Sequence, residues 1–354
     1  MNIRVLGIMV HQVNDLRRYL PFVTTALEEG FASVIVYTPD DVDLHHPVIR
    51  GYVYQLGRWV KQDHPYPSIS HDIGYYSGSD TLQKVKAIKS HPQLPFLGYG
   101  LGNKWNIHKH LIKSLQLKPY LLPTVPALNT STVMQMLKKH RAVMLKPLNG
   151  SRGKGIMKLS FDEHGYTLEE NEKLQQHFSE AEFRLTIAGI LSKERYLVQK
   201  WVDIRDQNGS VFDIRVLMQK NGSARWVLTG MGVRQGSQEK ITSNLTGGGQ
   251  AFPVLPFLKE QFSPSVAKEL HSKLERVSYL IPSFLERSYG KRLVELGLDI
   301  AIDRTTKIWI IEVNIKPGRT LWKKISDMEA DRISLRHPIQ YARYLLDKES
   351  KGAF

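Results

Sequence analysis

The chain has 354 residues, which is long for one hydrophobic core, so two or three packed lobes are expected. It contains no cysteine, which excludes disulfides, thiolate catalysis and zinc–thiolate sites. No apolar run approaches the roughly 18 residues of a membrane span, and Arg4 interrupts the first apolar stretch, which therefore does not resemble a signal peptide. We expect a cytoplasmic protein.

The formal net charge of +15 has three explanations: a nucleic-acid partner, an anionic substrate such as a nucleotide or an acidic peptide, or a solvated basic surface. The cations are spread along the chain and form no long basic tail. This distribution favours a basic cleft or a solvated surface over an arm that binds nucleic acid.

The first 95 residues have the pattern of an α/β domain. The expected elements are strands at 3–10, 32–37, 51–60 and 72–76 and helices at 16–27 and 80–90. The helix at 16–27 is expected to stop at Gly30, so that it and the strands at 3–10 and 32–37 form a β-α-β start. The alternation in 51–60 predicts a single half-buried strand.

A glycine-rich stretch, Arg141–Ile156, follows a flexible joint at 98–102 and helices expected at 104–115 and 130–140. Its apolar run ends at Lys146, and the next nine residues carry Gly150, Gly153 and Gly155 with two further cations. Glycine lets backbone N–H groups approach a ligand closely, so the stretch suits a polyphosphate. A plain hairpin turn is the alternative reading.

The remaining chain alternates strands and helices. Strands are expected at 156–161, 165–168, 196–202, 211–218, 224–233, 294–303 and 308–314, and helices at 179–191, 264–289 and from about Pro338. A second glycine-rich loop lies at 241–250.

Two acids and an amide are expected to meet on the strands near the C-terminus. If 304–307 is a four-residue turn, Asp299 lies opposite Glu312, and Asn314 shares a face with Glu312. Such hard oxygen ligands suit Mg²⁺. The alternative is that these acids lie on the surface beside a turn. The apolar neighbours of Glu312 argue against this alternative, because a buried unpaired charge is costly.

Together these features resemble the ATP-grasp superfamily over about residues 104–320, and most closely its YheC/YheD family, described as endospore-coat-associated. The motifs are Leu101–Trp105, Lys146–Ile156, Gln199–Val202, Asp213–Arg215, Thr229–Arg234, Asn244–Gly249 and Glu312–Gly318. The resemblance implies an ATP-grasp fold of the α/β (α+β) class, in which two α+β lobes clasp ATP. The implied domains are an N-terminal α/β domain (1–95), a linker and helical connection (96–135), a small lobe with a glycine-rich lid (136–205) and a large lobe with the metal site (206–354).

The resemblance also implies roles for the site residues. Lys104 and Lys146 would hold the α- and β-phosphates. Adenine would bind the Lys200 carbonyl and the Val202 amide. The other implied cofactor contacts are the lid (Gly150, Ser151, Arg152, Gly153, Lys154, Gly155), the hinge residues Gln199 and Trp201, and Asp206 for the ribose, with Asp203 as second choice.

The implied catalytic residues are Arg215 and Arg234, which would face the γ-phosphate and the transferring group, together with Asn244. Asp299, Glu312 and Asn314 would hold Mg²⁺. The last implied contacts are Lys316 and Arg319, on the carboxylate of the substrate.

The implied activity is that of an ATP- and Mg²⁺-dependent carboxylate–amine ligase that forms a carbon–nitrogen bond through an acyl phosphate. A catalytically silent ATP-binding protein of the endospore coat is the alternative, and a nucleic-acid-binding protein is a third, suggested by charge alone. The acid and the amine stay open between amino acids, peptides and a protein tail. Nothing in the sequence indicates the oligomeric state.

Overall fold

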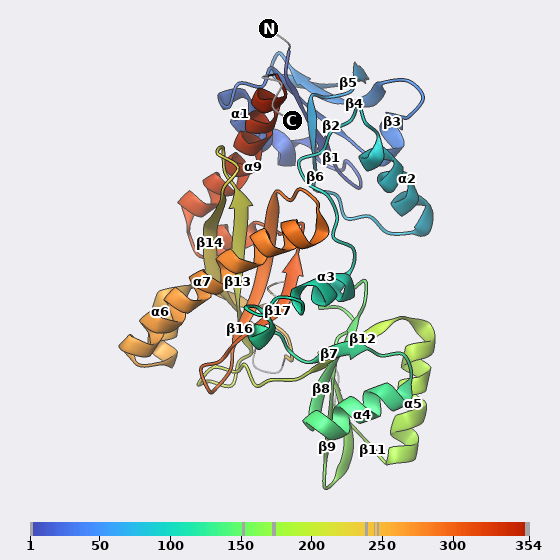
Figure 1. Ribbon diagram of the computed structural model, residues 1–354, viewed down its shortest axis with the longest axis vertical. Coiled ribbons are helices and arrows are strands. Elements are labelled where there is room, and N and C mark those ends of the chain that lie inside the picture. The colour runs from blue at the N-terminus through green and yellow to red at the C-terminus, as the bar shows by residue number, and fades with distance from the viewer. Residues whose placement is uncertain are drawn as a thin grey trace.

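The computed structural model contains three sheets, each packed with helices. It describes residues 3–150, 153–171, 175–237, 240–243, 245 and 248–350. The first and second sheets lie at opposite ends of the long axis, and the third lies between them (Figure 1). The mixture of parallel and antiparallel sheets with packed helices confirms the predicted α+β fold class. No helix in these ranges is long and apolar enough to cross a membrane.

The first sheet has the order β3-β4-β2-β1-β6, with β5 paired to β4. Its strands are β1 (Val5–Met9), β2 (Ser33–Tyr37), β3 (Val42–Asp43), β4 (Val48–Gln55), β5 (Arg58–Pro65) and β6 (Ile69–Asp72). Strand β1 runs parallel to β2 and to β6, and α1 (Leu20–Glu28) follows a 3-10 turn at Leu16–Tyr19. The predicted β-α-β start is therefore confirmed, as is the helix α2 (Ser79–Ser90).

The prediction of one strand over 51–60 is wrong. The chain reverses at Leu56-Gly57, where both residues have positive φ (49° and 79°), so that Gln55 pairs with Arg58 across a two-residue hairpin. The alternation survives on both arms, which is why the pattern resembled a single strand.

The second sheet has the order β11-β10-β9-β8-β12-β7. Its strands are β7 (Thr124–Pro126), β8 (Ala142–Pro147), β9 (Met157–Asp162), β10 (Gly165–Glu170), β11 (Gln176–Phe178) and β12 (Tyr196–Lys200). Helices α4 (Thr130–His140) and α5 (Glu180–Lys193) bury one face through a core that includes Val143, Leu145, Val198 and Phe183. Helices α4 and α5 do not cover the opposite face of this sheet. The connecting helix α3 (Lys104–Leu111) is shorter than predicted, and a 3-10 turn follows at Lys118–Tyr120.

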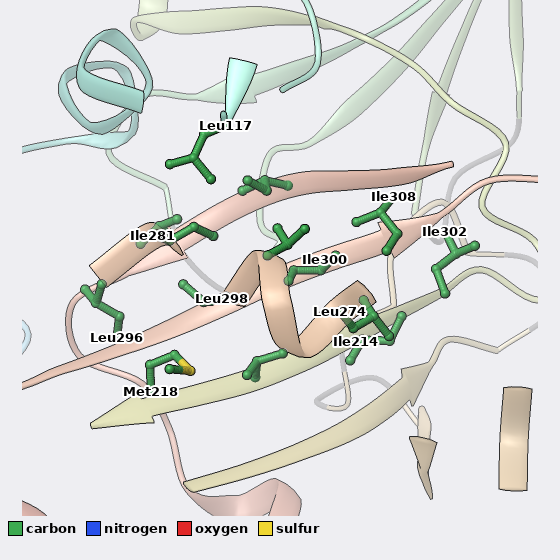
Figure 2. Packing of buried hydrophobic residues seen from close by; sticks show 14 of the residues in the cluster. Leu117, Ile214, Met218, Leu274, Ile281, Leu296, Leu298, Ile300, Ile302 and Ile308 are labelled. Atoms are coloured by element: carbon green, nitrogen blue, oxygen red, sulfur yellow. The ribbon is translucent and has the colours of Figure 1, made fainter. Parts of the chain in front are cut away.

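The third sheet is antiparallel, with the order β15-β14-β13-β16-β17. Its strands are β13 (Phe212–Lys220), β14 (Trp226–Gln235), β15 (Gln250–Pro253), β16 (Glu295–Ile302) and β17 (Ile308–Asn314). Helices α6 (Val254–Gln261) and α7 (Pro264–Tyr289) contribute to its main core, in which Leu274 and Ile281 pack with Ile214, Leu298 and Ile300 (Figure 2). Leu321 and Trp322 of α8 (Thr320–Lys324) belong to a smaller core with Leu217.

The last helix starts earlier than predicted. Helix α9 spans Met328–Glu349, so Pro338 lies inside it, and the side chain of Asp327 caps its first turn by accepting a hydrogen bond from Ala330 N–H. Figure 1 shows α9 beside α1 of the first sheet. There the buried carboxylate of Glu29 accepts a hydrogen bond from Arg336 Nε and forms an ion pair with Arg343, both residues of α9. The C-terminal helix thus joins the third sheet to the N-terminal domain.

Candidate functional site

One face of the second sheet turns away from the core and carries three polar side chains. Successive strand residues point to opposite faces, so while Leu145 and Val198 enter the core, Lys146 and Gln199 lie on the other side, with Thr124 of β7 paired to Gln199. Lys146 Nζ donates a 2.6 Å hydrogen bond to Gln199 Oε1, and Gln199 Nε2 donates a 2.9 Å bond to Thr124 Oγ1. The three side chains form one connected chain.

A cleft lies between this face, α3 and β17, with about 540 Å³ of empty space that includes space open to solvent. Its polar lining includes Lys104, Thr124, Lys146, Gln199 and Glu312. Its remaining lining is His108 and apolar residues: Ile107, Leu111, Leu121, Leu197, Ile310, Ile311 and Val313. The structure therefore brings together Lys104, Lys146, Gln199 and Glu312, which the sequence predicted from four separate segments. An apolar cavity with a few charged groups is the usual form of a ligand site.

The amine of Lys146 lies in a field of opposing charges. Burial, with the nearby charge of Lys104, lowers the pKa of Lys146 to about 8, while the carboxylates of Glu312, Asp299 and Asp213 act to raise it. Lys104 Nζ lies 3.6 Å from Glu312 Oε2. A bound anion would relieve the repulsion between the two amines and raise the pKa of Lys146. The arrangement thus suits a polyanionic ligand.

Two arginines converge on Asp299 of β16. Arg215, its register partner on β13, binds it through Nε–Oδ1 at 2.5 Å and Nη2–Oδ2 at 3.2 Å, and Arg234 Nη2 lies 3.0 Å from Oδ2. Burial raises the pKa of Asp299, but the two guanidinium groups outweigh this and lower it to about 2. Asp299 is therefore ionised at neutral pH.

Arg234 has a second partner, Asp213, which holds its guanidinium group in place. Asp213 accepts from Arg234 Nε at 2.7 Å and from Nη2 at 2.6 Å, and both side chains are buried. Ser243, in the second glycine-rich loop, donates its hydroxyl to the same carboxylate at 2.6 Å. The bidentate pair fixes the guanidinium geometrically.

The predicted metal ligands lie together on the third sheet. Asp299 and Glu312 are register partners, and Asn314 shares a face with Glu312. The predicted four-residue turn is wrong, because Ile302 pairs with Ile308. The predicted pairing of Asp299 with Glu312 is nevertheless present, since the register shifts by one residue between Asp299 and Ile300. Carboxylate and amide oxygens are the donors Mg²⁺ prefers, so the donor set fits. Each acid pairs with a cation in this structure, and no group of three or more His, Cys, Asp or Glu residues suited to a metal occurs in the described ranges.

The predicted lid is described in part. Ser151 and Arg152 lie outside the described residues, as does Asn244 of the second loop. Gly153 and Gly155 have φ of +72° and +69°, which β-carbon-bearing residues rarely adopt. A Cβ on Gly150 would lie 2.9 Å from Pro147 Cβ, so the loop folds closely over the end of β8, next to Lys146.

The predicted hinge, Gln199–Val202, begins in β12 and continues past its last residue, Lys200. Lys200 N–H donates to Pro123 O and Trp201 N–H to Ala142 O. In the described ranges the N–H of Val202 donates no hydrogen bond. Two cations lie close to the Trp201 ring, with Lys158 Nζ 4.9 Å and the Arg205 guanidinium carbon 5.9 Å from its centroid.

The carboxylate of Asp206 is used by its own loop. Oδ1 accepts from Asn208 N–H and Ser210 N–H, Oδ2 accepts from Gln235 Nε2, and the residue is 4% exposed. A ribose would have to displace these bonds. Asp203 is more accessible and pairs at its two oxygens with Arg205 and Arg304.

The two cations predicted to contact the substrate have structural partners. Lys316 Nζ donates to Asp72 Oδ1 at 2.7 Å and to Gly74 O, both in the N-terminal domain. Arg319 Nη2 donates to Glu295 Oε2 at 2.6 Å, and Glu295 is 3% exposed. In this structure both cations are thus paired with groups of the protein itself.

Sequence reasoning missed Thr124 and His108, which line the cavity. Thr124 lies on a three-residue strand whose pairing partner is more than seventy residues away, so no local pattern marked it. His108 could have been found from its spacing, because it follows Lys104 by one helical turn on α3.

Comparisons with known proteins identify a family and relatives of this chain. The family model described as YheC/D like ATP-grasp matches residues 93–345. Endospore coat-associated protein YheC of Bacillus subtilis (strain 168) is 26% identical over 327 residues, covering 90% of this chain and 89% of that protein. Endospore coat-associated protein YheD of the same strain is 24% identical over 344 residues, covering 94% and 75% respectively.

Solved structures share the fold at low sequence identity. D-cycloserine synthetase DcsG matches with a TM-score of 0.59 and 10% identity, covering 97% of this chain and 99% of that one. D-alanyl-alanine synthetase A from Vibrio cholerae matches with a TM-score of 0.58 and 12% identity, covering 98% and 100%. At such identities the likeness is one of fold alone.

Proposed function

Because this chain belongs to the YheC/D-like ATP-grasp family, we propose that it is an ATP- and Mg²⁺-dependent ligase that joins a carboxylate to an amine through an acyl phosphate. The observation that carries the proposal is that Lys104, Lys146 and Glu312 line one cavity, in which Lys104 Nζ lies 3.6 Å from Glu312 Oε2. Two amines and one carboxylate thus line the cavity together, and the charge of Asp299 acts on Lys146 from nearby.

ATP is assigned to the cavity between the small lobe (136–205) and the large lobe (206–354), with α3 of the connection (96–135) as a wall. Lys104 and Lys146 bind the α- and β-phosphates, and the Lys200 carbonyl and Val202 amide bind adenine. Gly150–Gly155 closes over the phosphates as a lid; in this proposal its residues Ser151 and Arg152 take part. For the ribose, the exposure of the carboxylates favours Asp203 over Asp206.

Asp299, Glu312 and Asn314 are the residues that would hold Mg²⁺. When bound, the ion neutralises phosphate charge and orients the phosphates for transfer. The cations that now pair with the acids, Arg215 and Arg234 on Asp299 and Lys104 on Glu312, are then available to the phosphates. The incoming polyanion makes this exchange of partners favourable.

The chemistry consists of two transfers that need no protein nucleophile. A substrate carboxylate oxygen attacks the γ-phosphorus, the bond to the bridging oxygen breaks, and ADP leaves. The amine nitrogen then attacks the acyl carbon, phosphate leaves, and the amine releases a proton. Arg215 and Arg234 stabilise the charge on the transferring group, and Asn244 belongs to the same proposed catalytic set. The chain's task is to hold two anions in line.

The test is ADP release with hydroxylamine as the amine, because hydroxylamine converts an acyl phosphate into a stable hydroxamate. The full-length protein is incubated with ATP, Mg²⁺ and a panel of amino acids and short peptides as carboxylates. We expect hydroxamate in amounts equal to ADP for at least one carboxylate, and none with the Glu312→Gln variant. ADP release without hydroxamate across the panel would contradict a ligase.

A second function is favoured by the names of the relatives, which are endospore coat-associated proteins. On this reading the chain is an ATP-binding structural protein associated with the spore and does not turn over. Tight ATP binding with neither ADP nor hydroxamate in any reaction would select it over the ligase.

A further inference from the structure

Strand β5 forms a free edge of the first sheet. It pairs with β4 over its whole length, from Arg58 beside the turn to Pro65, whereas β2 and β3 pair with the other side of β4. No strand in the described ranges pairs with the outer side of β5. Figure 1 shows β5 at the end of the molecule that lies away from the second sheet. The edge is therefore accessible to another chain.

The hairpin turn determines which backbone groups of β5 face outward. A two-residue turn with positive φ at both residues, as at Leu56-Gly57, closes on a hydrogen-bonded pair, here Gln55 and Arg58. Hydrogen-bonded and non-hydrogen-bonded pairs alternate along an antiparallel ladder, so every second residue from Arg58 onward bonds to β4. The residues between them turn their backbone groups outward: the N–H and C=O of Trp59, Lys61 and Asp63 and the C=O of Pro65.

Two of these outward residues are exposed and carry opposite charges. The side chain of Lys61 is 48% exposed, and its Nζ lies 4.0 Å from Asp41 Oδ1, too far for a hydrogen bond. Asp63 is exposed and forms no ion pair within the described part of the chain. Both charges are thus available to another molecule at this edge.

A second copy of the chain fits the edge in an antiparallel pairing about a two-fold axis, the commonest symmetry of homo-oligomers. Outward residues must then face outward residues, because only these exchange hydrogen bonds. Lys61 opposite itself brings like charges together, Lys61 opposite Pro65 brings Asp63 opposite itself, and Lys61 opposite Trp59 leaves Asp63 opposite the turn. Lys61 opposite Asp63 instead forms two pairs of opposite charge, one on each side of the axis. Such pairs stabilise a ladder, and like charges directly opposite destabilise it.

The other residues of β5 suit the same register. Gln62 lies on the axis and faces Gln62 of the second copy, and an amide carries both the donors and the acceptor that it needs to bond its own copy. Trp59 faces Pro65 at each end, where the missing N–H of proline removes one hydrogen bond and leaves the two central pairs complete.

We propose that the outer side of β5 is the interface of a two-fold homodimer, in which Lys61 of each copy lies opposite Asp63 of the other. Each of these pairs exchanges two backbone hydrogen bonds, so the first sheets of the two copies join into one. The interface is separate from the proposed ATP site, since β5 contributes no residue to that cavity.

The alternative is that Lys61 protects the edge from pairing, as lysine and proline do on many exposed strands. A protective lysine predicts a monomeric wild type, and no association after its charge is reversed, because a carboxylate protects equally well. The homodimer predicts association of the wild type and its loss when the charge is reversed.

The experiment measures the molar mass of the full-length protein by analytical ultracentrifugation over a range of concentrations. We expect a monomer–dimer equilibrium for the wild type. Lys61→Asp and Asp63→Lys each place like charges opposite each other at two points, so each should raise the dimer dissociation constant about tenfold or more. The double variant Lys61→Asp/Asp63→Lys restores both pairs of opposite charge and should return the constant to within about threefold of wild type.

A mixture of the two single variants gives the sharpest readout. Each variant repels its own copy, but a mixed dimer has opposite charges at both points, so the mixture should associate about as tightly as the wild type. Lys86→Asp, at an exposed lysine of α2, is the control and should not change the equilibrium.

A wild type that stays monomeric at every concentration would overturn the proposal, and so would a dimer whose dissociation constant changes less than twofold in both single variants. Either result leaves the proposed function untouched, because ATP binding is measured separately. If one single variant does not fold, as judged by circular dichroism, the other decides by the same criterion.

Discussion

Asp299 of β16 and Glu312 of β17 face each other because two irregularities in one hairpin cancel. The turn is one residue longer than a four-residue turn, so Ile302 pairs with Ile308, and this register alone would place Asp299 opposite Ile311. The irregularity between Asp299 and Ile300 shifts the pairing by one residue and restores Glu312. A one-residue slip moves a side chain to the other face of a sheet, so the bulge decides whether the two carboxylates meet.

Replacing Glu312 by Gln should remove the Mg²⁺-dependent part of ATP turnover, by about 100-fold or more, because one charged oxygen ligand is lost while the side-chain volume is kept. The measurement is ADP release against Mg²⁺ concentration. Glu329→Gln, an exposed acid in the first turn of α9, is the matched control and should behave as wild type. Equal turnover in Glu312→Gln and wild type would contradict the proposed role of Glu312 as a Mg²⁺ ligand.

Lys146 predicts a pH dependence of ATP binding. Its folded pKa of about 8 lies below the usual value of 10.5, so affinity should fall as pH rises through 8, where the ammonium is lost. The same depression means that the folded protein holds the proton less tightly than the unfolded chain. The free energy of unfolding should therefore rise between pH 8 and 10.5, relative to a Lys146→Met variant. Lys139→Met, an exposed lysine on α4, should change neither profile.

The buried pair of Arg234 and Asp213 predicts a loss of stability. Asp213→Asn removes the charge that holds the guanidinium fork, but Arg234 keeps Asp299 as a second partner. We expect the free energy of unfolding to fall by about 2 kcal/mol, as for a charged hydrogen bond rather than a fully orphaned charge. Urea unfolding measures it. A change below about 0.5 kcal/mol would show that the pair contributes little.

Arg319 should act through stability and not through the substrate. Arg319→Gln leaves Glu295 buried without its cation, at a cost of about 3 kcal/mol near neutral pH. Burial raises the pKa of Glu295, but Arg319 and His71 lower it to about 2. The stabilisation is present above the unfolded pKa of about 4.5 and is lost as pH falls toward 2, so the gap between the variants narrows there. Unchanged stability with a raised KM for the carboxylate would restore the substrate role predicted from the sequence.

The ribose prediction separates two aspartates. Asp203→Asn should lower the preference for ATP over 2′-deoxy-ATP several-fold, while Asp206→Asn should mainly destabilise its loop, because its carboxylate already accepts hydrogen bonds there. Dissociation constants for both nucleotides check this. A lost preference in Asp206→Asn alone would return the ribose to that residue.

The predictions that the structure bears out share a local cause. Lys146 ends an apolar strand, and the strands β16 and β17 read directly from alternation, so the sequence placed these residues on elements correctly. The meeting of Lys146 and Glu312 at one cavity was expected from a resemblance to a family, not from spacing.

The features that the sequence did not predict depend on distant partners. The reversal at Leu56-Gly57 has no breaker besides one glycine, and α9 runs through Pro338 because its burial against the protein outweighs the lost hydrogen bond. Lys316 and Arg319 follow a ligand motif, yet their charges are taken by Asp72 and Glu295, which lie far away in sequence. Ion pairs of this kind become visible only when the sheets are assembled.

The most direct measurement is the binding of ATP in the presence of Mg²⁺ to the full-length protein by isothermal titration calorimetry. The account predicts saturable binding of one ATP per chain, weakened at least tenfold by Lys146→Met and unaffected by Lys139→Met. Absence of saturable binding, or an equal affinity in wild type and Lys146→Met, would contradict the assignment of the cavity between the second sheet, α3 and β17 to ATP.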